Sequence, residues 1–570
     1  MTGITKRIGR APLESLLRLV AFYFICGGPV HAAAGTGFLI VAPDRGFLGN
    51  QEIRAVFEDF KATYTAASLI FVGRDYAGVG SAYSEHVQRA LGELQRAGAT
   101  DLVAIPFFVS DADPVLKKVK ASLSEYGHTG VVTWAHPMAD SYLIGQVVLD
   151  RAMELSRDPE HEQMVVVGFG ATDAANERAM HRDLNKLVDY LSRYQHFRES
   201  QAIVYYDRAT PDAEERNAAA DAVLTRMAAK KGRALAILAA LGPKFDHVMA
   251  LSSSLKRKFH EFDVAFSQEE LLPHPNVLRW RKKTANAYLP ATQAETGIVI
   301  MPHGANLIWN DAVERVIAPL RSTYHIEMAY GMGDPGIIQD AVSRLEDRHI
   351  RRIILVRMYA LAGHLKERTD YILGLSDALA PDRHGGGHDS PPTPPPQIRS
   401  AALFATFGGY EESPDISRIL HERIVEISRE PAKETVILIA HGEKTEEGNA
   451  MWLSIIQTHI DRLKQDTHCA QLKAIRAATV REDWPEQREK AVHDVRRMIQ
   501  DAARHGRALV IANRLYGAGP YRTLFDGLDY TLNDKGLAHP MLTQWLETGI
   551  ARMASVLAHP LPAGDPGALR

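Results

Sequence analysis

The sequence predicts an α/β protein built from four tandem, doubly wound parallel-sheet modules. The prediction rests on four similar stretches, each an apolar run, a turn containing Gly, Pro or Ala, and a polar loop that ends in Asn. They read FLIVAPDRGFLGN, MVVVGFGATDAAN, IVIMPHGANLIWN and VILIAHGEKTEEGN, and they begin at Phe38, Met164, Ile298 and Val436. With 570 residues the chain is also too long for a single core.

Each apolar run is interpreted as a short buried strand that leads into an amphipathic helix. Apolar residues with helical spacing follow the first and third runs, at positions 53, 56, 57 and 60 and at positions 313, 316, 317 and 320. Because Asn is a favoured N-cap, the helices are predicted to start at Asn50, Asn176, Asn310 and Asn449. A later strand-like segment in every repeat, such as RRIILVRMYALAGHL, completes a β-α-β-α-β-α pattern.

The repeats set the predicted domain boundaries. The four modules are expected at residues 35–150, 160–270, 294–376 and 433–556, with the second module degenerate, and to pair as two bilobal units. Residues 377–400 contain PDRHGGGHDSPPTPPPQ, a composition typical of an exposed, flexible linker. Residues 401–432 are interpreted as a structured segment that leads into module four.

The N-terminus has the pattern of a secretory signal. A basic head precedes the apolar run LVAFYFICGGPV and the small residues HAAAG, so residues 1–34 are predicted to be a cleaved signal peptide. An uncleaved anchor or a misassigned start codon is the alternative. With cleavage, we expect a periplasmic or secreted protein without membrane contact. Cys469 would be the remaining cysteine, which excludes an internal disulfide and a Cys-rich metal site.

Composition and motifs exclude several functional classes. The formal net charge is -3 and 24% of residues are charged, which gives no indication of a polyanion-binding surface, so no nucleic-acid partner is expected. No GxxxxGK[ST] motif occurs, and the glycine-rich YGMGDPG lacks the spacing of a dinucleotide loop. Neither ATP nor a nicotinamide cofactor is therefore expected. The GxSxG nucleophile motif is also absent.

Histidines follow predicted strands in the last two modules. His303 directly follows the first strand of module three, His364 follows a later strand of that module, and His441 takes the place of His303 in module four. Ligands of open α/β sheets bind at the carboxyl ends of the strands. Three imidazoles there would suit Co²⁺, Ni²⁺, Fe²⁺ or Zn²⁺, and neutral imidazole can accept protons. A single histidine at a strand end is more often a polar loop residue.

The other modules show which of these places need a histidine for folding. Pro43 and Phe169 stand where His303 stands, so the fold itself does not require histidine there. Asp113 and Tyr521 fall near the place of His364, and His247 is a loose equivalent in module two. Histidine at these places is therefore predicted to serve chemistry.

Two further features complete the candidate sites. Arg357 and Arg514 occupy matching places in modules three and four, and they are predicted to bind carboxylates of a ligand or, alternatively, to cap the sheet edge. His384 and His388, in HGGGH, are attributed to linker composition.

The strand ending in His-Gly, the helix that follows and the second strand running into AGH resemble the class II chelatases, the group of sirohydrochlorin cobaltochelatase and nickel chelatase. The resemblance covers residues 40–270 and 296–535 as four half-units. It implies ATP-independent insertion of a divalent metal, cobalt first and nickel or iron next, into a tetrapyrrole held between two facing half-modules. His303 and His364 would bind the metal and accept pyrrole protons, and His441 would assist. The alternative is a non-enzymatic periplasmic protein that binds metal or tetrapyrrole.

Overall fold

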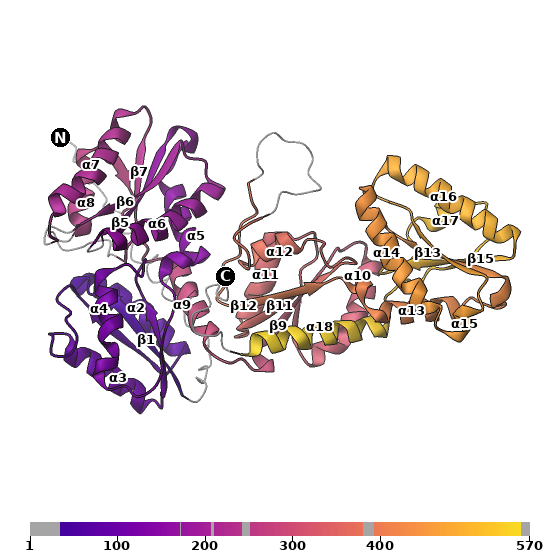
Figure 1. Cartoon of the computed structure of the whole chain (residues 1–570), viewed down its shortest axis with the longest axis horizontal. Helices are drawn as coiled ribbons and strands as arrows, with labels where there is room; N and C mark the ends of the chain where they lie inside the picture. The colour runs from indigo at the N-terminus through magenta and orange to yellow at the C-terminus, as the bar shows by residue number, and fades with distance from the viewer. Residues whose placement is uncertain (1–34, 171–172, 207–209, 242–250, 380–392, 560–570) are drawn as a thin grey trace, which may run out of the picture. The chain divides into compact units, whose positions relative to one another are not determined.

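The computed structural model describes residues 35–170, 173–206, 210–241, 251–379 and 393–559. The chain divides into two compact units (Figure 1). Unit one comprises Met1–Asp140, Val147–Asp189 and Phe197–Arg281, and unit two comprises Ser141–Gln146, Tyr190–His196 and Lys282–Arg570. The predicted signal peptide lies outside the described residues, as do His247, His384 and His388.

Within the described residues the strands form four separate four-stranded sheets, and every pairing within them is parallel. The strand order is the same in each sheet: β2-β1-β3-β4, β6-β5-β7-β8, β10-β9-β11-β12 and β14-β13-β15-β16. Helices connect successive strands, as parallel pairing requires. The predicted α/β class with four parallel-sheet modules is confirmed.

Unit one carries modules one and two. Module one contains β1 (Thr36–Pro43), α2 (Gly46–Thr63), β2 (Ala67–Val72), α3 (Ser84–Arg96), β3 (Asp101–Pro106), α4 (Pro114–Ser122), η1 (Leu123–Tyr126), β4 (Val132–Trp134) and η2 (Met138–Asp140). Next come α5 (Tyr142–Leu155), η3 (Pro159–His161), β5 (Gln163–Phe169), α6 (Ala174–Tyr194), β6 (Glu199–Tyr205), α7 (Ala213–Ala229), β7 (Ala234–Leu238), α8 (Leu251–Glu261), β8 (Val264–Phe266) and α9 (Pro275–Ala287). Parts of α5, α6 and α9 belong to unit two.

Unit two carries modules three and four. Module three contains η4 (Gln293–Glu295), β9 (Thr296–Pro302), α10 (Leu307–Ile317), η5 (Ala318–Ser322), β10 (His325–Met328), α11 (Pro335–Glu346), β11 (Arg352–Met358), α12 (Lys366–Ile372) and β12 (Leu403–Gly408). Next come η6 (Tyr410–Glu412), α13 (Pro414–Val425), η7 (Pro431–Lys433), β13 (Glu434–Ala440), α14 (Glu446–Leu463), α15 (Thr467–Ala470), β14 (Ala474–Thr479), α16 (Pro485–Arg504), β15 (Arg507–Asn513), α17 (Tyr521–Leu524), β16 (Thr531–Asn533) and α18 (Pro540–Ala558).

The middle of each central strand is apolar because both faces of the sheet are covered. In β9, Ile298, Val299, Ile300 and Met301 are each at most 1% exposed. Val299 and Met301 pack in a cluster confined to module three, whereas Ile298 and Ile300 face a second cluster. Alternate residues of one strand therefore supply two different cores.

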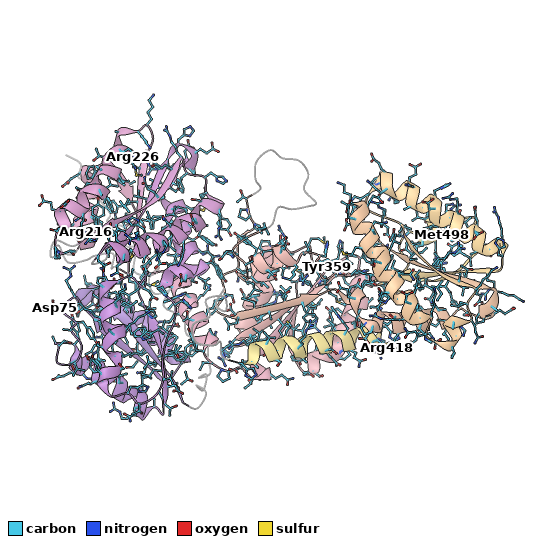
Figure 2. All side chains as sticks on the ribbon, viewed as in Figure 1. Asp75, Arg216, Arg226, Tyr359, Arg418 and Met498 are labelled. Carbon is cyan, nitrogen blue, oxygen red and sulfur yellow. The ribbon has the colours of Figure 1, made fainter. Side chains whose placement is uncertain are left out.

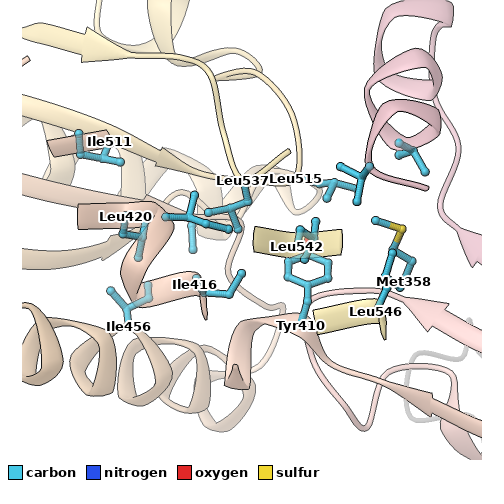
Figure 3. Close-up of a cluster of buried hydrophobic side chains, with 14 of the residues drawn as sticks. Met358, Tyr410, Ile416, Leu420, Ile456, Ile511, Leu515, Leu537, Leu542 and Leu546 are labelled. Carbon is cyan, nitrogen blue, oxygen red and sulfur yellow. The ribbon is translucent and has the colours of Figure 1, made fainter. Parts of the chain in front are cut away.

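The second cluster extends from module three into module four. It joins side chains of β9 and β11 to side chains of β13 and β15, with α13 and α18 between them (Figure 3). Leu420 of α13 and Leu542 and Leu546 of α18 are fully buried there. Modules three and four thus share one hydrophobic core.

Two predicted boundaries are corrected by this arrangement. β12 pairs with β11, so the fourth strand of module three lies beyond its predicted end at residue 376, within the predicted lead-in segment 401–432. The helix α18, drawn in yellow in Figure 1, lies along the sheet of module three, and its Thr543 hydroxyl donates to the Val316 carbonyl at 2.7 Å. The sequence places both elements next to module four, but burial of apolar surface assigns them to module three.

The end of the predicted linker is packed rather than exposed. Gln397, Ile398 and Ser400 are at most 3% exposed, and Ile398 belongs to the core cluster of module three. Gln397 donates from its side-chain amide to the Tyr371 carbonyl at 3.0 Å. The prediction of an exposed linker over 377–400 is therefore wrong for residues 397–400.

The helix starts differ from the predicted ones. The helix α10 has Asn306 as its N-cap, and Asn310 lies inside its first turns. The Asn310 side chain instead accepts a hydrogen bond from the Ala305 N–H at 3.0 Å, and Asn50 accepts one from the Arg45 N–H at 2.9 Å. In modules one and three the asparagine thus holds the strand-to-helix loop, whereas Asn449 of module four accepts from the Thr479 hydroxyl at 2.8 Å. Among the described residues, no helix combines the length and apolarity that a membrane crossing needs.

Candidate functional site at the carboxyl edge of module three

The sheet register brings the loops of module three together. Met358 at the end of β11 stands opposite Pro302 at the end of β9, so His303 and the loop 359–365 leave the sheet at the same edge. The strand β10 lies on the other side of β9, with Met328 opposite Ile300. Three consecutive loops therefore share the carboxyl edge, where open α/β sheets bind their ligands.

The loop after β9 presents His303 to solvent. Its Nδ1 lies 2.6 Å from the carbonyl oxygen of Gly304, so Nδ1 donates, and in the neutral form of the ring Nε2 carries the lone pair. Gly304 has φ +80°, and a Cβ there would lie 3.3 Å from Tyr330. The tight turn thus requires glycine and holds the imidazole at the edge.

The loop after β11 is tied to the loop after β10. The Tyr359 hydroxyl donates to the Gly331 carbonyl, and its oxygen lies 3.7 Å from the sulfur of Met332 (Tyr359 is labelled in Figure 2). The Tyr359 ring also packs on the His364 ring, with centroids 4.9 Å apart. Burial raises the pKa of Tyr359, so the phenol stays a protonated donor. The His364 side chain is therefore half-buried, with its ring packed against the ring of Tyr359.

Arg357 has a different role from the predicted one. Its side chain donates to the carbonyl oxygens of Ala362 and His364 and to the Thr406 hydroxyl, and the residue is 3% exposed. Burial lowers its pKa. The guanidinium therefore stabilises the loop that carries His364 through these hydrogen bonds, and it is not available for a ligand carboxylate.

Exposed apolar side chains surround this edge. Leu307 and Ile308, the first residues of α10, are 75% and 60% exposed, and Met332 and Ile337 are 46% and 42% exposed. Ile337 lies beside the Gly331 turn. Exposed apolar residues grouped around polar ones are typical of ligand-binding surfaces. Module three thus combines two histidines with an apolar surface at one edge.

His441 lies at the corresponding edge of module four in a more polar setting. Its Nε2 is 3.1 Å from Asp483 Oδ2, its Nδ1 is 3.0 Å from the Gly442 carbonyl, and its ring meets Trp484 edge-on. Both ring nitrogens therefore face oxygen acceptors. One of these contacts must open before His441 can bind a metal.

Arg514 does not match Arg357. By sheet register Ala512 stands opposite Ile439, as Arg357 stands opposite Met301, so Arg514 corresponds to Tyr359 instead. Its guanidinium pairs with Glu482. Burial acts to lower the pKa of Arg514, but the hydrogen bond and charge of Glu482 raise it. The predicted equivalence of the two arginines is wrong by two positions.

The side chains that stand near the place of His364 in modules one and four, Asp113 and Tyr521, have structural roles. The Asp113 carboxylate caps α4 by accepting from the N–H groups of Val115 and Leu116, and burial raises its pKa to about 6. Tyr521 is fully buried and its hydroxyl donates to the Ile439 carbonyl at 3.2 Å. Neither side chain faces a ligand, which distinguishes module three.

The predicted three-histidine centre is not assembled in this structure. Among the described residues, one group of three His, Cys, Asp or Glu side chains brings its ligand atoms within 4.8 Å of one another, and it consists of His421, Asp466 and Cys469. Sequence reasoning missed this group because His421 lies on a different helix from the other two. The only local signal is the Asp-x-x-Cys spacing.

A cavity of about 620 Å³ lies where modules three and four meet. It is lined by Arg315 of α10, by Tyr516 of the loop after β15, and by Lys535 and His539 of the loop between β16 and α18. None of His303, His364 and His441 lines it. The predicted cleft between facing half-modules therefore has a counterpart in unit two, but this cavity does not contain the predicted histidines.

No family model matches the chain, and no curated protein matches its sequence. Among solved structures, SirB from Bacillus subtilis with Fe3+ is 16% identical, over 44% of this chain and 97% of that chain, with a TM-score of 0.33. The sirohydrochlorin chelatase SirB from Bacillus subtilis subspecies spizizenii, in complex with cobalt, is 14% identical over 43% and 92%, with a TM-score of 0.30. DR2241 from Deinococcus radiodurans, a multi-domain protein with structural similarity to chelatases, is 15% identical over 48% and 56%, with a TM-score of 0.29. These likenesses concern the fold alone.

Proposed function

We propose that unit two inserts a divalent metal into a tetrapyrrole without ATP, at the carboxyl edge of module three. Cobalt is the first choice of metal, with nickel or iron next, and sirohydrochlorin is the first choice of macrocycle. The protein would act in the periplasm after removal of residues 1–34. The sequence resemblance to class II chelatases motivates the proposal.

One observation carries the proposal: His303 and His364 follow neighbouring strands of one sheet, beside an exposed apolar surface. The apolar residues Leu307, Ile308 and Met332 offer contact area for a flat macrocycle. The free lone pair at Nε2 of His303 offers a metal ligand or a proton acceptor. An apolar surface for the macrocycle and an imidazole nitrogen for the metal or the protons thus lie at the same edge of the sheet.

The reaction exchanges two pyrrole protons for one divalent cation. It needs no redox change and no ATP, because the N–H protons leave as the metal–nitrogen bonds form. A base at the ring centre accepts the protons, and a positioned base contributes roughly 10²- to 10⁴-fold to a rate. His303 would take this role, and His364, packed against Tyr359, would hold the entering metal.

A second candidate function is non-enzymatic binding of metal or tetrapyrrole. It is favoured by His441, whose two nitrogens both face oxygen acceptors, and by the absence of histidine at Pro43 and Phe169. A carrier needs an apolar surface and one or two metal ligands, but it does not need a base that accepts the pyrrole protons in each catalytic cycle.

The test compares His303→Ala and His364→Ala with His325→Ala. His325 is exposed at the opposite edge of the same sheet, so its loss controls for surface changes in module three. The proteins are mixed with Co²⁺ and excess sirohydrochlorin, and the absorbance change is followed. We expect multiple turnovers in the wild type and in His325→Ala, and a rate reduced about 10²- to 10⁴-fold in His303→Ala. Stoichiometric binding without product in the wild type would exclude the enzyme and support the carrier.

A further inference from the structure

A second group of potential metal ligands lies in unit two, away from the module-three edge. His421 comes from α13, and Asp466 and Cys469 come from the start of α15. One ligand atom from each of the three side chains lies within 4.8 Å of the others, and His421 Nε2 is 3.0 Å from Asp466 Oδ1. The three residues offer one nitrogen, one carboxylate oxygen and one sulfur.

Two of the three side chains are held firmly. Asp466 accepts hydrogen bonds from the N–H groups of His468 at 2.8 Å and Cys469 at 3.1 Å. Cys469 is 2% exposed and belongs to the core shared by modules three and four. Helix capping and core packing explain where these two residues lie.

Neither cause explains His421. Its Nε2 atom lies 3.0 Å from Asp466 Oδ1, at ion-pair distance, and its side chain is 32% exposed. This contact brings a nitrogen and an oxygen donor together, and both are groups that divalent metals of the zinc type accept as ligands.

The group borders a cavity of about 470 Å³. His421 and Asp466 line the cavity together with Ser417, Arg418 and Arg462, whereas Cys469 is not among its lining residues (Arg418 is labelled in Figure 2). A cation held by the three ligands would keep one position open toward this cavity. Arg418 already pairs with Asp415, and Glu422 also lines the cavity, so the charges there are mixed.

We propose that His421, Asp466 and Cys469 bind a divalent metal of the zinc type, with an open position facing the cavity. Mixed nitrogen, oxygen and thiolate ligands suit Zn²⁺, and three protein ligands with an open fourth position are typical of zinc sites that bind or activate a further ligand. The metal takes the place of the thiol proton of Cys469. The site is separate from the module-three edge and does not depend on the function proposed there.

The test uses the full chain in a His303→Ala/His364→Ala background, so that the module-three edge contributes nothing. The metal-free protein is titrated with Zn²⁺ by calorimetry, and with Co²⁺ while the thiolate-to-cobalt charge-transfer band is recorded. We expect one site that gives this band. Loss of outer partners of zinc ligands costs about 10- to 100-fold in affinity, so His421→Ala should cost at least as much.

Three variants complete the design. Cys469→Ser should abolish the charge-transfer band, and Asp466→Asn, which keeps a cap oxygen, should weaken Zn²⁺ binding. His493→Ala removes a histidine that is 70% exposed and should change nothing. Circular dichroism confirms folding of each variant. Unchanged affinity in His421→Ala together with an absent band in the parent protein would overturn the proposal, whatever the outcome of the chelatase assay.

Discussion

At the scale of single residues, one buried charge in unit two has a measurable consequence. Lys283 is 5% exposed and lies between the rings of Tyr142 and Phe404, with its Nζ 5.2 Å and 5.3 Å from their centroids. Burial lowers its pKa to about 8 from an ordinary 10.5, and Glu346 opposes this effect. The charged form is therefore disfavoured in the folded state.

We expect the stability of unit two to rise with pH because of Lys283. Between about pH 8 and 10.5 the unfolded chain binds the proton and the folded chain does not, so the free energy of unfolding increases through this range. The penalty is fully present below pH 8 and amounts to about 3 kcal/mol. Lys283→Met should remove this slope and stabilise the protein at pH 7, as measured by urea unfolding at several pH values.

The neighbouring lysine supplies the control. Lys282→Met changes the same charge on the same helix at a partly exposed position, and it should leave the slope in place. A slope that persists in Lys283→Met would show that another group titrates.

At the scale of elements, the loop 359–365 depends on a buried side chain of its own strand. Arg357 of β11 donates to the carbonyl oxygens of Ala362 and His364 and thereby fixes the return of the chain toward α12. Thr406 of the neighbouring strand β12 binds the same guanidinium at 3.2 Å. The position of His364 is thus set by the sheet interior.

We expect Arg357→Met to loosen this loop while keeping the packed volume. Removing a donor that leaves buried carbonyl groups unpaired costs about 1–3 kcal/mol. Hydrogen exchange should accelerate over residues 359–366, and the reaction that depends on His364 should slow. Arg348→Met removes an arginine that is 52% exposed from the same module and should leave exchange in this loop unchanged. Equal hydrogen exchange over residues 359–366 in the wild type and in Arg357→Met would contradict this stabilising role of Arg357.

At the scale of the whole molecule, unit two is held together by the core that modules three and four share. Its members come from both sheets and from α13 and α18, and Leu546 of α18 is fully buried within it. The Trp545 ring meets the Phe407 ring of β12 with centroids 5.5 Å apart. Modules three and four should therefore unfold as one cooperative body.

We expect Leu546→Ala to destabilise both modules together. A buried leucine truncated to alanine costs about 2–5 kcal/mol. Hydrogen exchange should accelerate in β9 and in β13 to a similar degree. Val556→Ala, on the same helix but 64% exposed, should change the stability by less than about 0.5 kcal/mol. Faster exchange in only one of the two strands would show that the modules unfold separately.

The sequence predicted the modules because their signal is local. A strand that is covered on both faces of a parallel sheet is apolar over most of its length, and the runs at residues 38, 164, 298 and 436 show this directly. The edge position of His303 and His364 followed from the same reasoning, since parallel strands end at a common edge. The Asn-started helices were wrong because the asparagine side chain binds the loop rather than the helix terminus.

The sequence by itself thus determined the α/β class, the four repeats and the two histidines that follow neighbouring strands of module three. Only the tertiary structure decided that β12 and α18 complete module three, that Arg357 serves the loop, and that His421 meets Asp466 and Cys469. Periodicity reports which face of an element is buried, but not which distant element covers it. That choice is made by the packing of apolar surface between segments far apart in the chain.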